Sequence, residues 1–254
     1  MDADTIDAFH RGRFHLVQPA RGAHRAGIDA MILAAAVPKE FAGNLADLGA
    51  GAGAAGLAVA SRCPEARVTL VERSPVMADY AARTVSHPLN AHLKERLSVL
   101  QADVTLAGLA RTKAGLADNA FDFAIMNPPF NDASDRMTPD AVKAEAHVME
   151  ADLFEAWIRT AAAIVRPGGG MAIIARPASI APILDALSGR FGGAAIVPIH
   201  PRPAKVAIRI VIRATRGSRT GLTLEPALIL HGQTGNGLST RAEAIANGEA
   251  GLFD

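Results

Sequence analysis

Residues 44–56 read NLADLGAGAGAAG, an apolar run that passes into alternating glycines and then into alanines. The run predicts a β-strand over 44–49, and the alanine-rich sequence predicts a helix over 54–62. Glycines let the backbone approach a ligand closely, and the free N–H groups at the start of a helix attract polar ligand groups. The stretch therefore predicts a ligand-binding turn between a strand and a helix, with a simple tight turn as the alternative.

The alternation of strand and helix continues toward the C-terminus. Strands are predicted over 44–49, 67–72, 97–102, 121–126 and 171–175, and helices after Ser74-Pro75 and over 152–165 and 181–187. This alternation predicts an α/β, Rossmann-like fold with a mostly parallel sheet and helices on both faces. Strands 194–198 and 205–214 have no room for a helix between them, so we expect antiparallel neighbours. The prediction is a seven-stranded sheet with one antiparallel strand near the C-terminus.

The glycines fit two kinds of ligand. Gly51, Gly53 and Gly56 match the dinucleotide fingerprint G-x-G-x-x-G. Asp47, Gly49, Gly51 and Gly53 match D-x-G-x-G-x-G, which is typical of S-adenosylmethionine loops. Both patterns hold an adenosine-containing ligand for the same physical reasons.

Acidic residues follow the next two strands. Glu72 closes the strand 67–72, where a carboxylate can accept both hydroxyls of a ribose. Its neighbour Arg73 is a further candidate contact. Asp103 can accept a hydrogen bond from an adenine amino group while Val104 packs on the ring, although Asp103 could instead cap the next turn. The predicted cofactor contacts in this region are Asp47, Gly49, Gly51, Gly53, Glu72, Arg73, Asp103 and Val104.

Strand 121–126 ends in Asn127-Pro128-Pro129-Phe130. In open α/β sheets, ligands bind at the carboxyl ends of the strands. The prolines fix φ and remove two N–H donors, so the Asn127 side-chain oxygen and the Pro128 carbonyl can accept both hydrogens of a planar NH2 group. The nitrogen lone pair then faces an electrophile, and Phe130 offers a ring for stacking, worth ~1–3 kcal/mol per base. The pattern predicts N-methylation by alignment, with these four residues as the catalytic set and Asn127 also against the cofactor.

Together these motifs resemble class I S-adenosylmethionine-dependent methyltransferases that act on planar amino groups. Four further segments are similar to the bacterial tRNA(Val) adenine-N6 methyltransferase family: GRFHLVQP (12–19), HRAGIDA (24–30), AHVM (146–149) and PRP (201–203). The resemblance implies methyl transfer from S-adenosylmethionine to N6 of an adenine beside a tRNA anticodon. It also implies that the helix before the glycine loop closes over the cofactor, with Arg25 at the cofactor carboxylate and Gly27 beside it.

The chain departs from this family after the motif, where Asn131-Asp132 replaces a second aromatic residue. A protein glutamine amide or a guanine N2 therefore stays open as the acceptor. An NAD-binding protein or a non-catalytic cofactor-binding protein is less favoured, because neither has a use for residues 127–130. The polar segment 131–143 is interpreted as a lid over the substrate.

The sequence between 187 and 223 carries seven cations and no carboxylate. On the predicted strand 205–214, Lys205, Arg209 and Arg213 share one face, opposite a Val/Ile face. These residues and Arg202 are candidate RNA contacts. A charged edge strand, or cations paired with acids elsewhere, is the alternative reading.

The overall composition excludes several classes of protein. The formal net charge is +1, which rules out a polycationic binder. Cys63 is the only cysteine, so no intrachain disulfide can form, and the histidine spacing predicts no metal. No apolar run reaches the ~20 residues of a spanning helix, and the chain start does not read as a signal peptide, so we expect a cytoplasmic protein without a membrane partner.

We expect one structural unit, with an N-terminal extension over 1–40 that includes the closing helix and a catalytic domain over 41–254. We expect a monomer or a homodimer. Trp157 lies in a helix of apolar spacing and is expected in the core.

Overall fold

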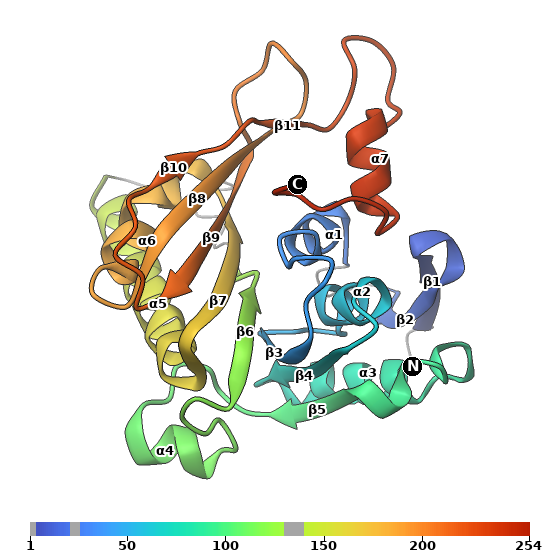
Figure 1. Cartoon of the computed structure of the whole chain (residues 1–254), viewed down its shortest axis with the longest axis horizontal. Coiled ribbons are helices and arrows are strands. Elements are labelled where there is room, and N and C mark those ends of the chain that lie inside the picture. The colour runs from blue at the N-terminus through green and yellow to red at the C-terminus, as the bar shows by residue number, and fades with distance from the viewer. Residues whose placement is uncertain (1–3, 21–25, 130–139) are drawn as a thin grey trace.

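The computed structural model describes residues 4–20, 26–129 and 140–254, except the side chains of 140–151. The main sheet has nine strands in the order β10-β8-β9-β7-β6-β3-β4-β5, with β11 also paired to β8 (Figure 1). The strands are β3 (Gly43–Leu48), β4 (Ala66–Glu72), β5 (Leu97–Gln101), β6 (Phe121–Met126), β7 (Val165–Ala175), β8 (Phe191–His200), β9 (Arg209–Arg216), β10 (Thr223–Leu224) and β11 (Leu228–Ile229).

One strand of this sheet runs against the others. β9 pairs antiparallel with both β7 and β8, while every other pairing within the described sheet is parallel. The strands β3 to β9 are the predicted seven, and the two-residue strands β10 and β11 extend the sheet beside β8. The predicted α/β architecture with one antiparallel strand near the C-terminus is confirmed.

Helices cover both faces of the sheet, as the alternation of elements predicts. They are α1 (Ile28–Ala34), α2 (Ala54–Arg62), α3 (Pro75–Ser86), α4 (Gly108–Lys113), α5 (Asp140–Ile164), α6 (Ile180–Leu187) and α7 (Thr240–Ala246). Short 3-10 turns lie at His10–Gly12, Pro88–Asn90, Lys94–Arg96 and Pro177–Ser179. None of the helices formed by described residues is long and apolar enough to cross a bilayer.

Two apolar clusters lie on opposite faces of the sheet. Neighbouring residues of β3, Leu45 and Ala46, belong to different clusters because successive strand side chains point to opposite faces. Residues of α1, α2, α3 and α7 pack in the first cluster, and residues of α5 and α6 pack in the second (Figure 1). The parallel strands are buried on both faces, which explains why they read as continuous apolar runs rather than as alternating ones.

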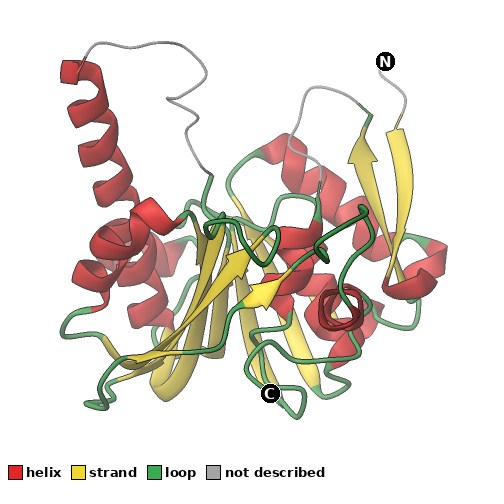
Figure 2. Ribbon diagram, turned by 90° about the horizontal axis from the view of Figure 1, so that it is seen from above, coloured by secondary structure: helices red, strands yellow, loops and turns green. Residues whose placement is uncertain are grey.

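The N-terminal extension forms a hairpin of its own. β1 (Asp4–Phe9) and β2 (Phe14–Pro19) pair antiparallel and stand apart from the main sheet (Figure 2). The outer edge of β2 is covered by side chains rather than by a strand: Val17 N donates to Thr84 Oγ1 at 3.0 Å and His15 N donates to Asn90 Oδ1 at 2.9 Å. These two polar residues are fully buried because they replace a neighbouring strand.

The C-terminal tail closes over the end of α1. Arg62 donates through Nη1 to the carbonyl of Ala34 at 2.7 Å and through Nη2 to the carbonyl of Ala250 at 3.4 Å. Leu252 N donates to the carbonyl of Ala35 at 2.8 Å. Cys63, the next residue after Arg62, is fully buried, and burial raises the pKa of its thiol. The tail is thus part of the folded unit.

Two of the differences between predicted and observed element bounds bear on the predicted site. Helix α5 begins at Asp140 instead of 152, since Ala, Glu, Lys and Met over 140–151 are good helix formers. The predicted lid therefore contributes 140–143 to a helix, and its remaining residues, 131–139, lie outside the described residues. Strand β9 begins at Arg209, so Lys205 is not on the strand and the exposed Val206 and Ile208 do not form its buried face.

Candidate active site

The glycine loop between β3 and α2 begins at Gly49, whose φ is +72°. A Cβ at this position would lie 2.4 Å from Cη2 of Trp157, so neither the backbone conformation nor the space allows a side chain. The loop continues to Gly53, which has φ +96° and is the N-cap of α2. The loop backbone is therefore fixed by the fold.

Asp47 lies beneath this loop. Its side chain is almost completely buried, and Oδ2 accepts a hydrogen bond from Gly56 N at 2.8 Å. Burial raises its pKa to about 7, although the hydrogen bond from Gly56 opposes the shift and the nearby Glu72 adds to it. The sequence predicts Asp47 as a cofactor contact. In the structure its carboxylate bonds to the first turn of α2, and the cofactor contact stays a prediction.

Glu72 joins the loop to the next helix. Its Oε2 accepts from Gly51 N at 2.9 Å, and its Oε1 accepts from Ser74 N at 2.8 Å. A carboxylate oxygen has a further lone pair, so both oxygens can still accept from a ligand hydroxyl. Glu72 thus holds the glycine loop, and the same carboxylate can accept hydrogen bonds from the ribose as predicted.

The segment after β5 forms the far side of the site. Asp103 Oδ1 accepts from Thr105 N at 2.8 Å and from Thr105 Oγ1 at 2.7 Å. Partial burial alone would raise the pKa of Asp103, but these two hydrogen bonds and the charge of Arg73 lower it. Val104 is buried, Arg73 is exposed, and Asp103 stays ionised beside the place predicted for an adenine.

The motif after β6 stands next to the glycine loop. Leu48 pairs with Met126 in the parallel sheet, so Gly49 and Asn127 follow the carboxyl ends of adjacent strands. Asn127 Oδ1 is buried and accepts no hydrogen bond from any described residue. Pro128 is buried and Pro129 is exposed, while Phe130 lies outside the described residues. A buried acceptor without a donor is costly, so a ligand NH group fits this place.

The N-terminal side of the site is held by Gln18, a residue that the motifs did not identify. Gln18 is buried, its Oε1 accepts from Ala26 N at 2.8 Å, and its Nε2 donates to Asp7 Oδ2 at 2.8 Å. It thereby places Gly27, the exposed N-cap of α1, while Arg25 lies outside the described residues. The available signal was a polar side chain at an otherwise apolar strand position.

The predicted RNA-binding cations have different partners in the structure. Arg202 donates through its two Nη atoms to the carbonyls of Gly232 and Gly235, at 2.9 and 2.8 Å. Arg209 forms an ion pair with Asp29 at 2.8 Å, and Arg213 stacks on Phe253 with its Cζ 4.0 Å from the ring centroid. Lys205 is exposed in the β8–β9 connection. Arg202, Arg209 and Arg213 therefore make contacts within the fold, and Lys205 faces solvent.

No group of three or more His, Cys, Asp or Glu side chains that could hold a metal ion is found in the described parts of the chain. The polar groups that the structure places at the carboxyl edge are instead the carboxylates of Glu72 and Asp103 and the amide oxygen of Asn127. These groups suit an adenosine-containing organic ligand, to which Glu72 and Asp103 would be hydrogen-bond acceptors.

Comparisons with known proteins agree with this geometry. Residues 23–200 match the family model of the methyltransferase small domain. A tRNA1(Val) (adenine(37)-N6)-methyltransferase of Porphyromonas gingivalis is 28% identical over 238 residues, which cover 90% of this chain and 89% of that protein.

Solved structures of methyltransferases are also similar to this chain. The crystal structure of protein Atu636 from Agrobacterium tumefaciens, described as a predicted O-methyltransferase, is 44% identical with a TM-score of 0.77, covering 88% of this chain and 98% of that one. A Thermus thermophilus 16S rRNA N2 G1207 methyltransferase (RsmC), solved with AdoMet and guanosine, shares the fold at a TM-score of 0.53 and 22% identity, covering 84% and 50% of the two chains. The prediction of an S-adenosylmethionine-dependent methyltransferase is confirmed. With its family model matching most of its length, the chain belongs to the methyltransferase small domain family.

Proposed function

We propose that this protein transfers a methyl group from S-adenosylmethionine to the exocyclic N6 of an adenine in RNA, with a tRNA near its anticodon as the substrate. The observation that carries the proposal is the buried Asn127 Oδ1, which lacks a donor from the described residues and lies beside the glycine loop. Relatives named for adenine(37)-N6 methylation of tRNA1(Val) support this choice of acceptor.

Asn127 and Pro128 hold the acceptor amine. The Asn127 side-chain oxygen and the Pro128 carbonyl accept its two hydrogens, which turns the nitrogen lone pair toward the cofactor. S-adenosylmethionine supplies an electrophilic methyl group on a sulfonium. The amine releases its proton after the transfer, so no side chain has to act as a strong base. Alignment of the two reactants can contribute ~7–11 kcal/mol to the lowering of the barrier.

The cofactor contacts divide between two loops in this proposal. Glu72 accepts the ribose hydroxyls, Gly51 and Gly53 line the loop, and Asp103 with Val104 holds the adenine. Arg25, Gly27, Gly49 and Arg73 complete the proposed set, and Asp47 supports it from below. The hairpin and α1, which belong to the predicted N-terminal extension over 1–40, cover the cofactor beside the predicted catalytic domain over 41–254.

Lys205 is the cation that we propose for RNA contact. The β8–β9 connection follows the carboxyl end of β8, which runs in the same direction as β6, so it lies at the edge of the sheet that carries Asn127. Lys205 is exposed there beside Val206, whose relative exposure is 84%. Arg202 stabilises this connection by its contacts to the loop 232–236. We also propose that the protein acts in the cytoplasm, where a tRNA substrate is found, and that it is a monomer or homodimer.

The deciding experiment is label transfer from methyl-labelled S-adenosylmethionine to total tRNA, followed by nucleoside mass spectrometry. N6-methyladenosine is the expected product, and Asn127→Ala should abolish it while calorimetry shows nearly unchanged cofactor affinity. Label in guanosine, in a protein glutamine or in a hydroxyl group would replace the adenine assignment. Binding of NAD in place of S-adenosylmethionine would overturn the proposal as a whole.

A further inference from the structure

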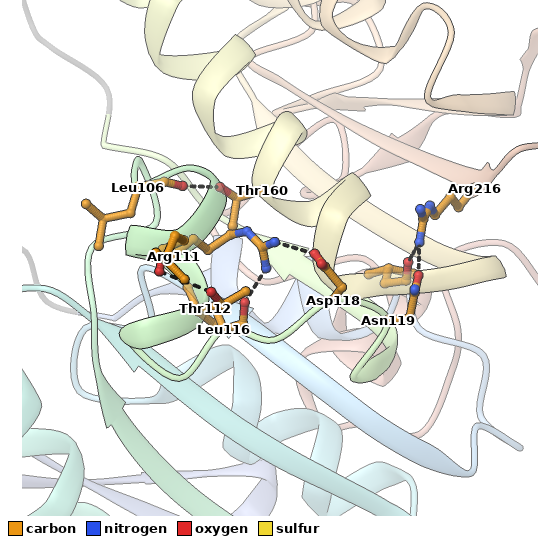
Figure 3. A network of polar contacts seen from close by, with 10 residues as sticks. Leu106, Arg111, Thr112, Leu116, Asp118, Asn119, Thr160 and Arg216 are labelled. Atoms are coloured by element: carbon orange, nitrogen blue, oxygen red, sulfur yellow. Dashed lines mark hydrogen bonds and ion pairs between the residues drawn. The ribbon is translucent and has the colours of Figure 1, made fainter.

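Helix α5 contacts both loops that form the cofactor side of the site. Thr160 Oγ1 donates to the carbonyl of Val104 at 2.6 Å, and it lies 3.3 Å from the carbonyl of Leu106 (Figure 3). Arg159 Nη2 donates to the carbonyl of Thr105 at 3.3 Å. Three successive carbonyls of the segment after β5 are therefore contacted from one helix.

The same helix reaches the glycine loop through Trp157. Its indole ring occupies the space that a Cβ of Gly49 would need, with Cη2 at 2.4 Å from that position. Trp157 and Thr160 are three positions apart, so they lie on the same face of the helix. Both side chains are buried, at 6% and 1% relative exposure. One helix face thus touches the first glycine of the loop and the segment that follows Asp103.

These contacts exceed what packing of a helix on a sheet requires. A threonine within a helix commonly bonds to a carbonyl of its own preceding turn. Thr160 instead donates its hydroxyl to the carbonyl of Val104, which accepts from no backbone N–H among the described residues. On the other side, Asp103 accepts from Thr105 N, so the short segment 103–106 is held from both directions.

We propose that Trp157 and Thr160 are positioning residues that fix the shape of the cofactor pocket. Thr160 acts through Val104 on the adenine side, and Trp157 acts through Gly49. The proposal rests on the function proposed above. Thr160 holds Val104 at the depth where it meets the adenine ring, and Trp157 holds the first turn of the glycine loop.

The test removes the Thr160 hydroxyl with little change of shape. Thr160→Val should weaken binding of S-adenosylhomocysteine in calorimetry by about tenfold, the scale of one lost hydrogen bond with its acceptor left buried. The KM for S-adenosylmethionine should rise to match, with kcat at saturation within about twofold because Asn127 is untouched. Thr160→Ser, which keeps the hydroxyl, should restore the affinity.

A matched control is Thr112→Val on α4, because Thr112 Oγ1 donates to the carbonyl of Leu109 at 3.0 Å on the exposed side of the molecule. It should leave cofactor affinity unchanged. Equal affinity of Thr160→Val and wild type would overturn the proposal, as would weak binding that Thr160→Ser fails to restore. If Thr160→Val does not fold, Thr160→Ser and Trp157→Phe are compared with wild type in the same titration.

Trp157 provides a second readout because it is the only tryptophan in the chain. S-adenosylhomocysteine should change its fluorescence in wild type, and in Thr160→Val the same change should occur at higher ligand concentration. Trp157→Phe, measured by calorimetry, should also lose affinity, and unchanged affinity contradicts the role of Trp157. Wild type that binds the cofactor but methylates no RNA adenine defeats the proposed function alone, since the affinity measurements do not depend on the acceptor.

Discussion

Asp47 of β3 and Glu72 of β4 are two buried carboxylates beside the glycine loop, and they have different hydrogen-bond partners. Glu72 bonds to the glycine loop at Gly51, while Asp47 bonds to Gly56 in α2. Motif spacing identified both residues, because it reports which residue types recur along the chain. It does not report which way each side chain points, since that depends on the packing of α2 on the sheet.

Replacing Asp47 with Asn keeps an acceptor for Gly56 N and removes the buried charge. The pKa of Asp47 is raised to about 7 in the folded protein, so between about pH 4 and pH 7 the folded state binds a proton that the unfolded state has lost. The free energy of unfolding of the wild type therefore decreases as the pH rises from about 4 to about 7. The stability of Asp47→Asn relative to wild type should therefore increase from pH 4 to pH 7, by on the order of 1–3 kcal/mol, in urea unfolding.

The control is Asp47→Leu, which leaves Gly56 N without an acceptor. It should be about 1–3 kcal/mol less stable than Asp47→Asn at every pH, because neither variant titrates at this position. A relative stability of Asp47→Asn that is the same at pH 4 and pH 7 would show that Asp47 is not the titrating group.

Among the elements, β6 and β9 show where sequence patterns suffice. β6 has its predicted bounds, 121–126, because Pro128 and Pro129 end the strand by local chemistry. β9 begins at Arg209, four residues after the predicted start, because its start depends on pairing with Ile199 of β8 and with Ala175 of β7. A start that is fixed by partners distant in sequence has no local signal. Of the three cations predicted on one strand face, Lys205 therefore lies before the strand, while Arg209 and Arg213 lie within it.

The contact between α5 and the glycine loop predicts a specific energetic coupling. Gly49→Ala should destabilise the protein, because its Cβ would overlap Trp157 and its φ is positive. Trp157→Phe removes the outer ring atoms that cause the overlap. The double variant should therefore be more stable than the sum of the single effects, with a coupling of about 1–3 kcal/mol in thermal or urea unfolding. Additive effects would mean that Trp157 and Gly49 do not press on one another in solution.

On the scale of the whole molecule, the chain ends were the part that sequence patterns did not reveal. The hairpin edge is covered by Thr84 and Asn90, and the tail is held by Arg62. These partners lie between 67 and 188 positions away in the sequence. Single polar side chains that satisfy distant backbone groups leave no periodic pattern in the sequence. The parallel sheet could be predicted because each of its strands and helices has a periodic pattern.

Arg62 joins α1, α2 and the tail, so its loss should affect both the stability of the fold and the attachment of the tail. Arg62→Lys keeps the charge but cannot reach the carbonyls of Ala34 and Ala250 together. We expect a stability loss of about 1–3 kcal/mol and faster proteolysis within the last residues of the chain. Arg241→Lys is the matched control, because Arg241 bonds only to the carbonyl of Leu252 among the described contacts. Equal cleavage of the two variants would contradict the role of Arg62.

His10 lies where the hairpin, α2 and the tail meet. It bonds to Ser61 Oγ at 3.3 Å, and burial together with the charges of Arg62 and Arg13 lowers its pKa to about 4. Between about pH 6.5 and pH 4 the unfolded chain takes up a proton that folded His10 does not, so stability should fall as the pH decreases. His10→Asn, which tolerates the positive φ of 49°, should remove up to about 3 kcal/mol of this acid sensitivity in urea unfolding at several pH values. An unchanged slope between pH 6.5 and pH 4 would exclude His10 as its source.

The environment of Cys63 has a practical consequence for work on RNA recognition. Its thiol is fully buried and has a raised pKa, so it reacts poorly with maleimides at neutral pH. A cysteine introduced at the exposed Val206 would then be the single thiol available for labelling, with no need to replace the native one. A photocrosslinker or spin label attached there can report directly on which nucleotides approach the carboxyl edge of the sheet.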